Sequence, residues 1–141
     1  MRKLQRIRHV ACALAALAVF VPVSVRAEEA CRAPAQSKLA IELMFGRNVE
    51  GRLVVTDRAW TRFVADEVTP RFPEGFSVVD ASGQYRNARG GIAFEPSKLM
   101  VIVAAEGAQT EDSVAAIVAA YKMKFNQRLV GVLTRVVCAS F

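Results

Sequence analysis

Two runs of apolar residues at helical spacing, each flanked by stretches at strand spacing, constrain this chain more than any other feature. Thr56 is a residue type that caps helices, and Pro70 biases the residue before it away from helical angles. Between them, four apolar residues recur at intervals of three and four: Trp60, Phe63, Val64 and Val68. The sequence therefore predicts a first helix between Thr56 and Pro70.

The second run predicts a longer helix in "TEDSVAAIVAAYKMKFNQ", which spans residues 110–127. Thr110 is the expected N-cap, and Glu111 and Asp112 suit the positive end of the helix dipole. Its apolar stripe would face the core: Val114, Ile117, Val118, Tyr121 and Phe125.

Strand-like alternation fills the segments around these helices. In "KLAIELMFGR" every second residue is large and apolar, with Gly46 at the end, whereas "NVEGRLVV" reads as a loop or short irregular segment. Residues 76–105 predict two strands joined at "NARGG", with Pro96 expected to interrupt the second and to mark an edge or a bulge. "LVGVLTRVV" predicts a final strand.

The predicted order is β-α-β-β-α-β, the ferredoxin-like pattern of an α+β domain. Such a domain has a four-stranded antiparallel sheet with two helices on one face. Its first and last strands are antiparallel neighbours, which would bring Cys31 close to Cys138.

The N-terminus has the layout of a secretory signal peptide. Basic residues in "MRKLQRIRH" precede an apolar run from Val10 to Val21, and Val25 and Ala27 suit a cleavage site after Ala27. The run is shorter than the roughly 20 residues of a spanning helix, so an uncleaved anchor is the weaker reading. We expect a signal peptide at 1–27, a tether at 28–37 and one domain at 38–141, in the periplasm or the medium.

Cleavage would change both the charge and the cysteine count. Five of the 19 basic residues would be lost, which leaves 14 against 13 acidic residues and gives no reason to expect nucleic acid or a membrane surface as partner. Cys12 would also be lost. The remaining pair, Cys31 and Cys138, predicts a disulfide in an exported protein, with two unrelated thiols as the alternative.

His9, the one histidine, lies in the predicted signal peptide. A mature chain without histidine excludes Ser-His-Asp and Cys-His catalysis in their ordinary forms, as well as imidazole zinc sites. No phosphate-loop or dinucleotide spacing occurs either. We expect no metal and no cofactor.

The polar candidates for a site lie at strand ends and turns. Arg71 lies in a corner fixed by Pro70, Pro73 and Gly75, where a rigid guanidinium could grip a carboxylate or phosphate. The alternative is structural, with Arg71 or Arg47 paired to Glu95 or Asp80. The full candidate set for a ligand or partner is Arg47, Arg71, Gln84, Tyr85, Arg86, Glu95, Ser97 and Lys98.

Several unusual stretches occur together and in order: "ELMFGR" (42–47), "VTPRFPEGFSVVDASGQYR" (68–86), "EPSK" (95–98) and the closing "CASF" (138–141). In these stretches the chain resembles DUF3574, a bacterial family of unknown function. The resemblance runs from about residue 38 to the end. It implies a small envelope protein of a family whose members are exported or lipid-anchored, and it carries no activity.

Two hypotheses of different class follow. The first is a non-catalytic envelope module that binds a protein partner or a small ligand, with a homodimer through the sheet left open. The second is a small hydrolase or lyase-type enzyme, with Glu95 as base and Arg47, Arg71 or Lys98 holding an anionic substrate. The enzyme requires Glu95 and an arginine to converge in a pocket.

Overall fold

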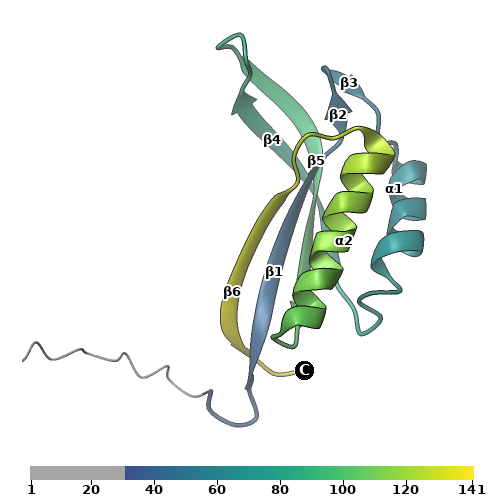
Figure 1. The fold of residues 1–141 in the computed structure, drawn as a ribbon. Helices are drawn as coiled ribbons and strands as arrows, with labels where there is room; N and C mark the ends of the chain where they lie inside the picture. Colours follow the sequence, from purple (N-terminus) through teal and green to yellow (C-terminus); the bar gives the residue numbers. More distant parts are fainter. Residues whose placement is uncertain (1–30) are drawn as a thin grey trace, which may run out of the picture.

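A computed structural model describes residues 31–141, and Figure 1 shows its fold. The predicted signal peptide lies outside the described residues, as do residues 28–30 of the predicted tether. The main elements follow in the predicted order: β1 (Gln36–Gly46), α1 (Asp57–Phe63), β4 (Ser77–Arg86), β5 (Ile92–Ala104), α2 (Ala108–Phe125) and β6 (Gly131–Ala139). A π turn, η1 (Val64–Val68), extends α1.

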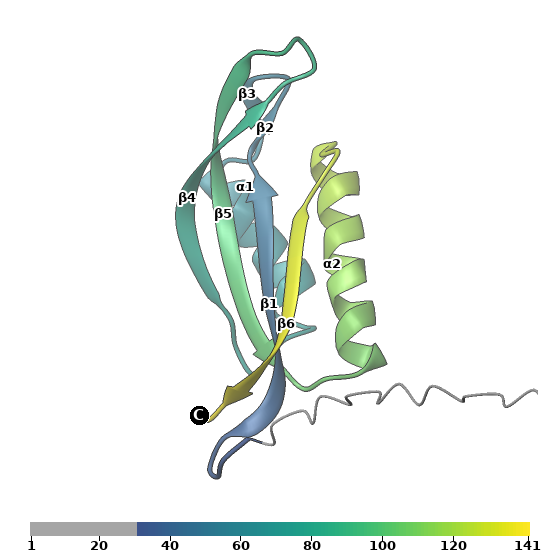
Figure 2. The ribbon, with the colours of Figure 1, turned by 90° about the vertical axis from the view of Figure 1, so that its left-hand side faces the viewer.

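The sheet order is β4-β5-β1-β6, and every neighbouring pair is antiparallel. Both helices cover the same face of this sheet (Figure 1), and Figure 2 shows the sheet from the other side. The predicted ferredoxin-like α+β fold is confirmed. We call the uncovered side the helix-free face.

The core lies between the sheet and the helices and is rich in aromatic rings. On β1, Ile41, Leu43 and Phe45 alternate toward the helices and are fully buried. The ring of Phe45 lies 4.6 Å from that of Tyr121 and 5.1 Å from that of Trp60, measured between centroids. These tilted and edge-on contacts are the geometries that aromatic pairs prefer.

The first helix begins as the sequence predicts. The hydroxyl of Thr56 accepts a hydrogen bond from the backbone N–H of Ala59 at 3.2 Å, which caps α1. Its last turn widens, because the N–H of Thr69 bonds the carbonyl of Val64, five residues back. Pro70 follows and has no N–H with which to continue the helix.

The second helix begins earlier than predicted. Gly107 is the N-cap of α2, with φ of 132°, so the prediction of Thr110 as cap is wrong. Thr110 lies inside the first turn, where its hydroxyl donates to the carbonyl of Ala105 at 2.8 Å. A positive φ at the cap suits glycine, which explains why the turn starts there.

Pro96 lies inside β5, which runs without a break between β4 and β1, so the expected interruption is wrong. In an antiparallel strand, the N–H and C=O of one residue point toward the same neighbour. The carbonyl of Pro96 accepts from the N–H of Arg47 at 3.0 Å, just past the end of β1 at Gly46. The missing N–H of Pro96 therefore faces the side where β1 has ended, and no bond to β4 is lost.

The segment 48–55, predicted as a loop or short irregular stretch, contains a two-stranded hairpin. Its strands are β2 (Asn48–Val49) and β3 (Arg52–Leu53). Glu50 and Gly51 both have positive φ at the turn between them. None of the helices in residues 31–141 is long and apolar enough to cross a membrane.

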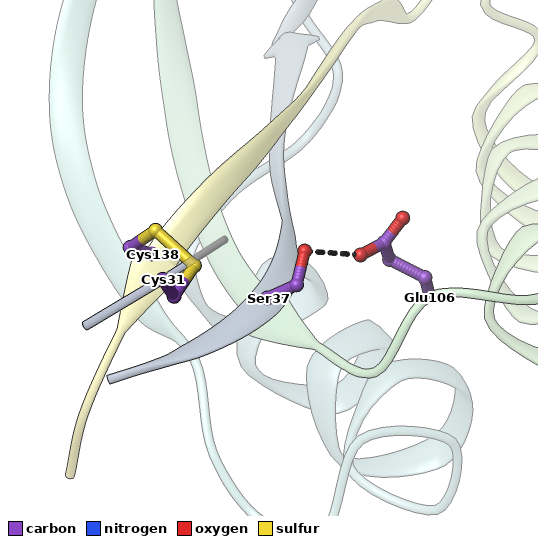
Figure 3. The surroundings of a disulfide bond; sticks show 4 residues. All are labelled: Cys31, Ser37, Glu106 and Cys138. Atoms are coloured by element: carbon purple, nitrogen blue, oxygen red, sulfur yellow. Dashed lines mark hydrogen bonds between the residues drawn. A yellow bond between two sulfur atoms is a disulfide. The ribbon is translucent and has the colours of Figure 1, made fainter. Parts of the chain in front are cut away.

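The predicted disulfide between Cys31 and Cys138 is present, with Cα atoms 5.4 Å apart. Figure 3 shows that it joins the segment before β1 to the end of β6. Beside it, the hydroxyl of Ser37 donates to Glu106 at 2.6 Å. The bond closes a loop of 107 residues, which corresponds to about 4–5 kcal/mol in the chain-entropy model. β1 begins at Gln36, two residues before the predicted domain boundary.

Candidate functional site

Two buried cations meet two exposed carboxylates at the end of β1, on the helix-covered side of the sheet. Arg47 and Lys98 are each only 8% exposed. The Nη2 of Arg47 lies 2.9 Å from Asp57 Oδ1, and the Nζ of Lys98 lies 3.3 Å from the same oxygen. Lys98 also pairs with Asp80 across the β4–β5 register. We call these four residues the charge cluster.

The backbone around Arg47 holds this cluster in place. Its N–H reaches the carbonyl of Pro96, and its own carbonyl accepts from the N–H groups of Val54 and Val55 at 3.0 and 3.1 Å. The Nε of Arg47 donates to the carbonyl of Val55 at 2.7 Å. Arg47 therefore ties β1, β5 and the segment before α1 together.

The contact between Lys98 and Asp80 favours the charged forms of these two residues. The hydrogen bond from Lys98 holds the pKa of Asp80 below its ordinary value. The same bond raises the pKa of Lys98. Because both cations are already matched by carboxylates, the arrangement serves as a structural tie, and an incoming anion would have to displace Asp57 or Asp80.

Glu95 lies on the opposite side of the sheet from these cations. It shares the alternation of Ser97 and Leu99, whereas Lys98 shares that of the core residue Met100. A Cβ placed on Gly46 would lie 1.8 Å from Glu95 Oε1, so the carboxylate rests against the bare backbone of β1. Burial raises the pKa of Glu95, and this side chain takes part in none of the ion pairs among residues 31–141.

The carbonyl of Gly46 accepts hydrogen bonds from two side chains, one near the end of α2 and one in the segment after it. The hydroxyl of Tyr121 and the Nε2 of Gln127 each donate to it at 2.9 Å. Gln127 also donates to the carbonyl of Asn48 at 2.9 Å. Burial raises the pKa of Tyr121, so this hydroxyl remains protonated and acts as a hydrogen-bond donor.

Arg71 lies at the other end of β5. Its Nη1 donates to the carbonyl of Glu67 at 2.6 Å and pairs with the carboxylate of that residue at 3.1 Å, rather than with Glu95 or Asp80. Arg71 lines a shallow hollow of about 260 Å³ together with Val103 and the first turns of α2. Eight residues of strand, about 26 Å, separate Val103 from Glu95.

The remaining candidates are dispersed along the β4–β5 hairpin. Arg86 donates to the carbonyl of Gly90 at 2.8 Å and fastens the turn. Tyr85 is exposed, and Gln84 pairs in register with Phe94. Ser97 pairs with Gly46 and Ala81. The structure thus brings Arg47 and Lys98 together and leaves the other candidates apart.

A second hollow, of about 290 Å³, lies on the helix side, where Arg58 and Arg62 of α1 meet Lys124 of α2. Neither this hollow nor the one at Arg71 includes Glu95. Within the described part of the chain, no group of three or more acidic, cysteine or histidine side chains is placed to hold a metal ion.

The feature that sequence reasoning missed is the apolar centre of the helix-free face. The registers place residues of all four strands beside one another there: Val79, Leu99, Val101, Val103, Met44 and Leu133. Val79 is 54% exposed, Leu133 50% and Met44 42%. On β1 and β5 a signal was present, since Met44, Leu99, Val101 and Val103 alternate with core residues. Val79 and Leu133 join them only once the register is known.

Comparisons with known proteins give a family and a fold. The model of the family described as "Protein of unknown function (DUF3574)" matches residues 40–141. No curated protein matches the chain.

Two solved structures are similar in fold. A phage SAM lyase in complex with S-methyl-5'-thioadenosine has 20% identity and a TM-score of 0.57, covering 72% of this chain and 90% of that one. CutA from Synechococcus elongatus has 17% identity and a TM-score of 0.50, covering 73% of this chain and 80% of that one. At such identities the likeness shows the fold alone.

Proposed function

The chain belongs to DUF3574, a family of unknown function, and we propose that it is a non-catalytic interaction module that binds protein through its helix-free face. The partner that we propose is a second copy of the chain. We retain the expectation of an exported protein, for which the disulfide gives support, since such bonds persist in oxidising compartments.

The observation that carries this proposal is the exposed apolar centre of the helix-free face. A sheet with one apolar face covered by helices ordinarily presents polar residues on the other. Here Val79 and Leu133 remain half exposed, and Leu99, Met44 and Val101 lie between them. Glu42, which is paired with Arg135, lies between Val101 and Leu133. Contiguous apolar surface of this kind marks interaction sites in soluble proteins.

The geometry gives the enzyme hypothesis less support. That hypothesis requires Glu95 to converge with an arginine or lysine around a substrate. Arg47 and Lys98 are engaged by Asp57 and Asp80 on the helix-covered side, and Arg71 is bonded to Glu67 at the far end of β5. Within residues 31–141, Glu95 therefore has no ion-pair partner with which to hold an anionic substrate.

Photo-crosslinking in cells that express the full chain tests the proposal. A photoreactive residue replaces Leu133 or Val79 on the helix-free face. The control replaces Met123, which is 81% exposed on α2. We expect adducts from the sheet positions and none from Met123.

The mass of the adduct separates the two parts of the proposal. Twice the mass of the chain would support a second copy as partner. A different mass would keep the helix-free face as the binding surface and reject the second copy. Absence of adducts at both sheet positions would contradict the interaction surface itself.

A further inference from the structure

The helix-free face carries opposite charges at its two ends. Glu95 lies at one end, beside Gly46 and Gly83. Lys38 lies at the other, on the same side of β1 as Met44, because it alternates with the inward-facing Leu39 and Ile41. Neither Glu95 nor Lys38 takes part in an ion pair within residues 31–141.

The register places these two charges at equal distances from the middle of the apolar centre. Leu39 pairs with Ala104, so Lys38 lies one residue beyond the end of β5, at the level of residue 105. Met100 is then five residues from Glu95 in one direction and five residues from the level of Lys38 in the other. Each interval is about 17 Å of strand.

Consider a two-fold axis that lies between two facing sheets and runs perpendicular to the strands at the level of Met100. This axis would place the Glu95 end of one copy over the Lys38 end of the other. Leu99 of one copy would then meet the level of Val101 of the other, so that the apolar row of Val79, Leu99 and Met44 faces a row with Val101 and Leu133, in which Glu42 is already paired within its own chain. Such an interface is isologous, and one kind of contact occurs twice. The level of Glu95 in each copy would face the level of Lys38 in the other.

We propose, resting on the function proposed above, that two copies pack helix-free face to helix-free face with opposed strands, so that Glu95 of each copy pairs with Lys38 of the other. Packed sheets lie about 10 Å apart, and β5 and β1 are neighbours separated by about 4.8 Å. A lysine side chain reaching from one sheet and a glutamate from the other can span this distance. The pairing would set the register, whereas the apolar centre would supply most of the affinity.

The glycines around Glu95 leave room for its carboxylate beside the backbone of β1 and β4. Gly83, its partner on β4, would place a Cβ 3.9 Å or more from any neighbouring atom. Larger side chains at Gly46 and Gly83 would occupy the space on both sides of the carboxylate. The other ion pair on this face, Arg135 with Glu42 at 2.7 Å, lies closer to the middle and is complete within one chain.

The test is a charge-swap series on the purified protein, read by sedimentation velocity across a range of concentrations. We expect wild type to dimerise, and Glu95→Lys and Lys38→Glu each to raise the dimer Kd by about tenfold or more, because like charges would meet twice per dimer. The double variant Glu95→Lys with Lys38→Glu should return to within about threefold of wild type. Lys122→Glu makes the same charge change on exposed α2 and should leave the dimer unaffected.

Circular dichroism melts will show whether each variant is folded. If Glu95→Lys does not fold, Glu95→Gln with Lys38→Gln gives a milder cycle, in which we expect coupling of the same sign but smaller size, with the double variant no weaker than either single. A wild type that stays monomeric, single variants with unchanged Kd, or a double variant weaker than either single would overturn this arrangement. Crosslinks from Leu133 to another protein would, in that case, keep the helix-free face as the binding surface and reject the second copy as partner.

Discussion

The two faces of the sheet differ in how fully a single chain buries their apolar side chains and pairs their charges. On the helix-covered face, Phe45 packs among aromatic rings and the cations of Arg47 and Lys98 are both matched by carboxylates. On the helix-free face, Leu133 remains half exposed and Glu95 has no ion-pair partner among residues 31–141. The core under the helices is thus complete, although Val132 and Val136 of the edge strand β6 are half exposed on that side. The centre of the helix-free face retains apolar area and charge that association could use.

The largest expected effect comes from a substitution in the core on the helix-covered face. Phe45→Ala should lower the free energy of unfolding by about 4 kcal/mol, because it removes a fully buried ring from the aromatic core. Leu133→Ala, on the opposite side of the sheet, should cost under about 1 kcal/mol in the monomer. Urea unfolding at low protein concentration measures both. Equal losses would contradict the contrast between the faces.

The next effect concerns the ion pairs on the two faces. Arg47→Met keeps the aliphatic stem but removes charge-assisted hydrogen bonds to Asp57 and Val55, so we expect a loss of about 2 kcal/mol. The matched control is Arg135→Met, since Arg135 is exposed and pairs with Glu42 on the helix-free face. That change should cost about 0.5 kcal/mol. If Arg135→Met lowered stability as much as Arg47→Met, the burial of Arg47 would not make its ion pair more stabilising than the exposed pair of Arg135.

A smaller effect tests the contact between Gly46 and Glu95. Gly46→Ala would place a methyl group 1.8 Å from Glu95 Oε1, so the flexible carboxylate must move away. We expect a loss of about 1 kcal/mol, most of which should disappear in the background of Glu95→Ala. Additive effects in this double-mutant cycle would show that the two residues do not touch.

The smallest effects are pH-dependent and have opposite signs on the two faces. The pKa of Asp80 is lowered by Lys98, so its stabilising contribution is present above its unfolded pKa near 3.8 and is lost as the pH falls through the folded value. Asp80→Asn should therefore destabilise the protein at pH 7, and the difference should shrink in acid.

Glu95 should behave in the reverse manner. Burial raises its pKa above 4.5, so the folded state holds the proton more tightly and stability falls as the pH rises through that window. Glu95→Gln should leave the monomer at least as stable as wild type at pH 7. In acid, where the carboxyl group of wild type is protonated, the variant should be no more stable than wild type. NMR titration of both carboxyl groups gives the check, and a lowered pKa for Glu95 in the monomer would count against its unpaired state.

The order of elements and the disulfide were predictable from the sequence because periodicity and cysteine number are local signals. The helical stripe ending at Phe125 and the alternation around Phe45 each identify an element without knowledge of its neighbours. The cap of α2 was missed because Thr110 is the better cap by residue type, whereas Gly107 is used for its positive φ.

The site was less predictable because its contacts depend on register. Arg47 and Lys98 were recognised as candidates, but their pairing with Asp57 requires β1, β5 and the start of α1 to be placed together in space. The position of Glu95 opposite these cations depends on the parity of β5, which continues through Pro96 where the sequence predicted an interruption. Single-residue shifts in a strand reverse the face, so such contacts cannot be derived from composition.

Methionine oxidation provides the most direct test of the claim that the helix-free face is covered by a partner copy. Met44 lies on that face at 42% exposed, Met123 lies on α2 at 81%, and Met100 is fully buried. Initial oxidation rates by dilute peroxide, mapped by mass spectrometry, would be compared across protein concentrations. We predict that Met44 becomes protected as the concentration rises, while Met123 stays fast and Met100 stays slow. A rate for Met44 that does not change with concentration would contradict the account.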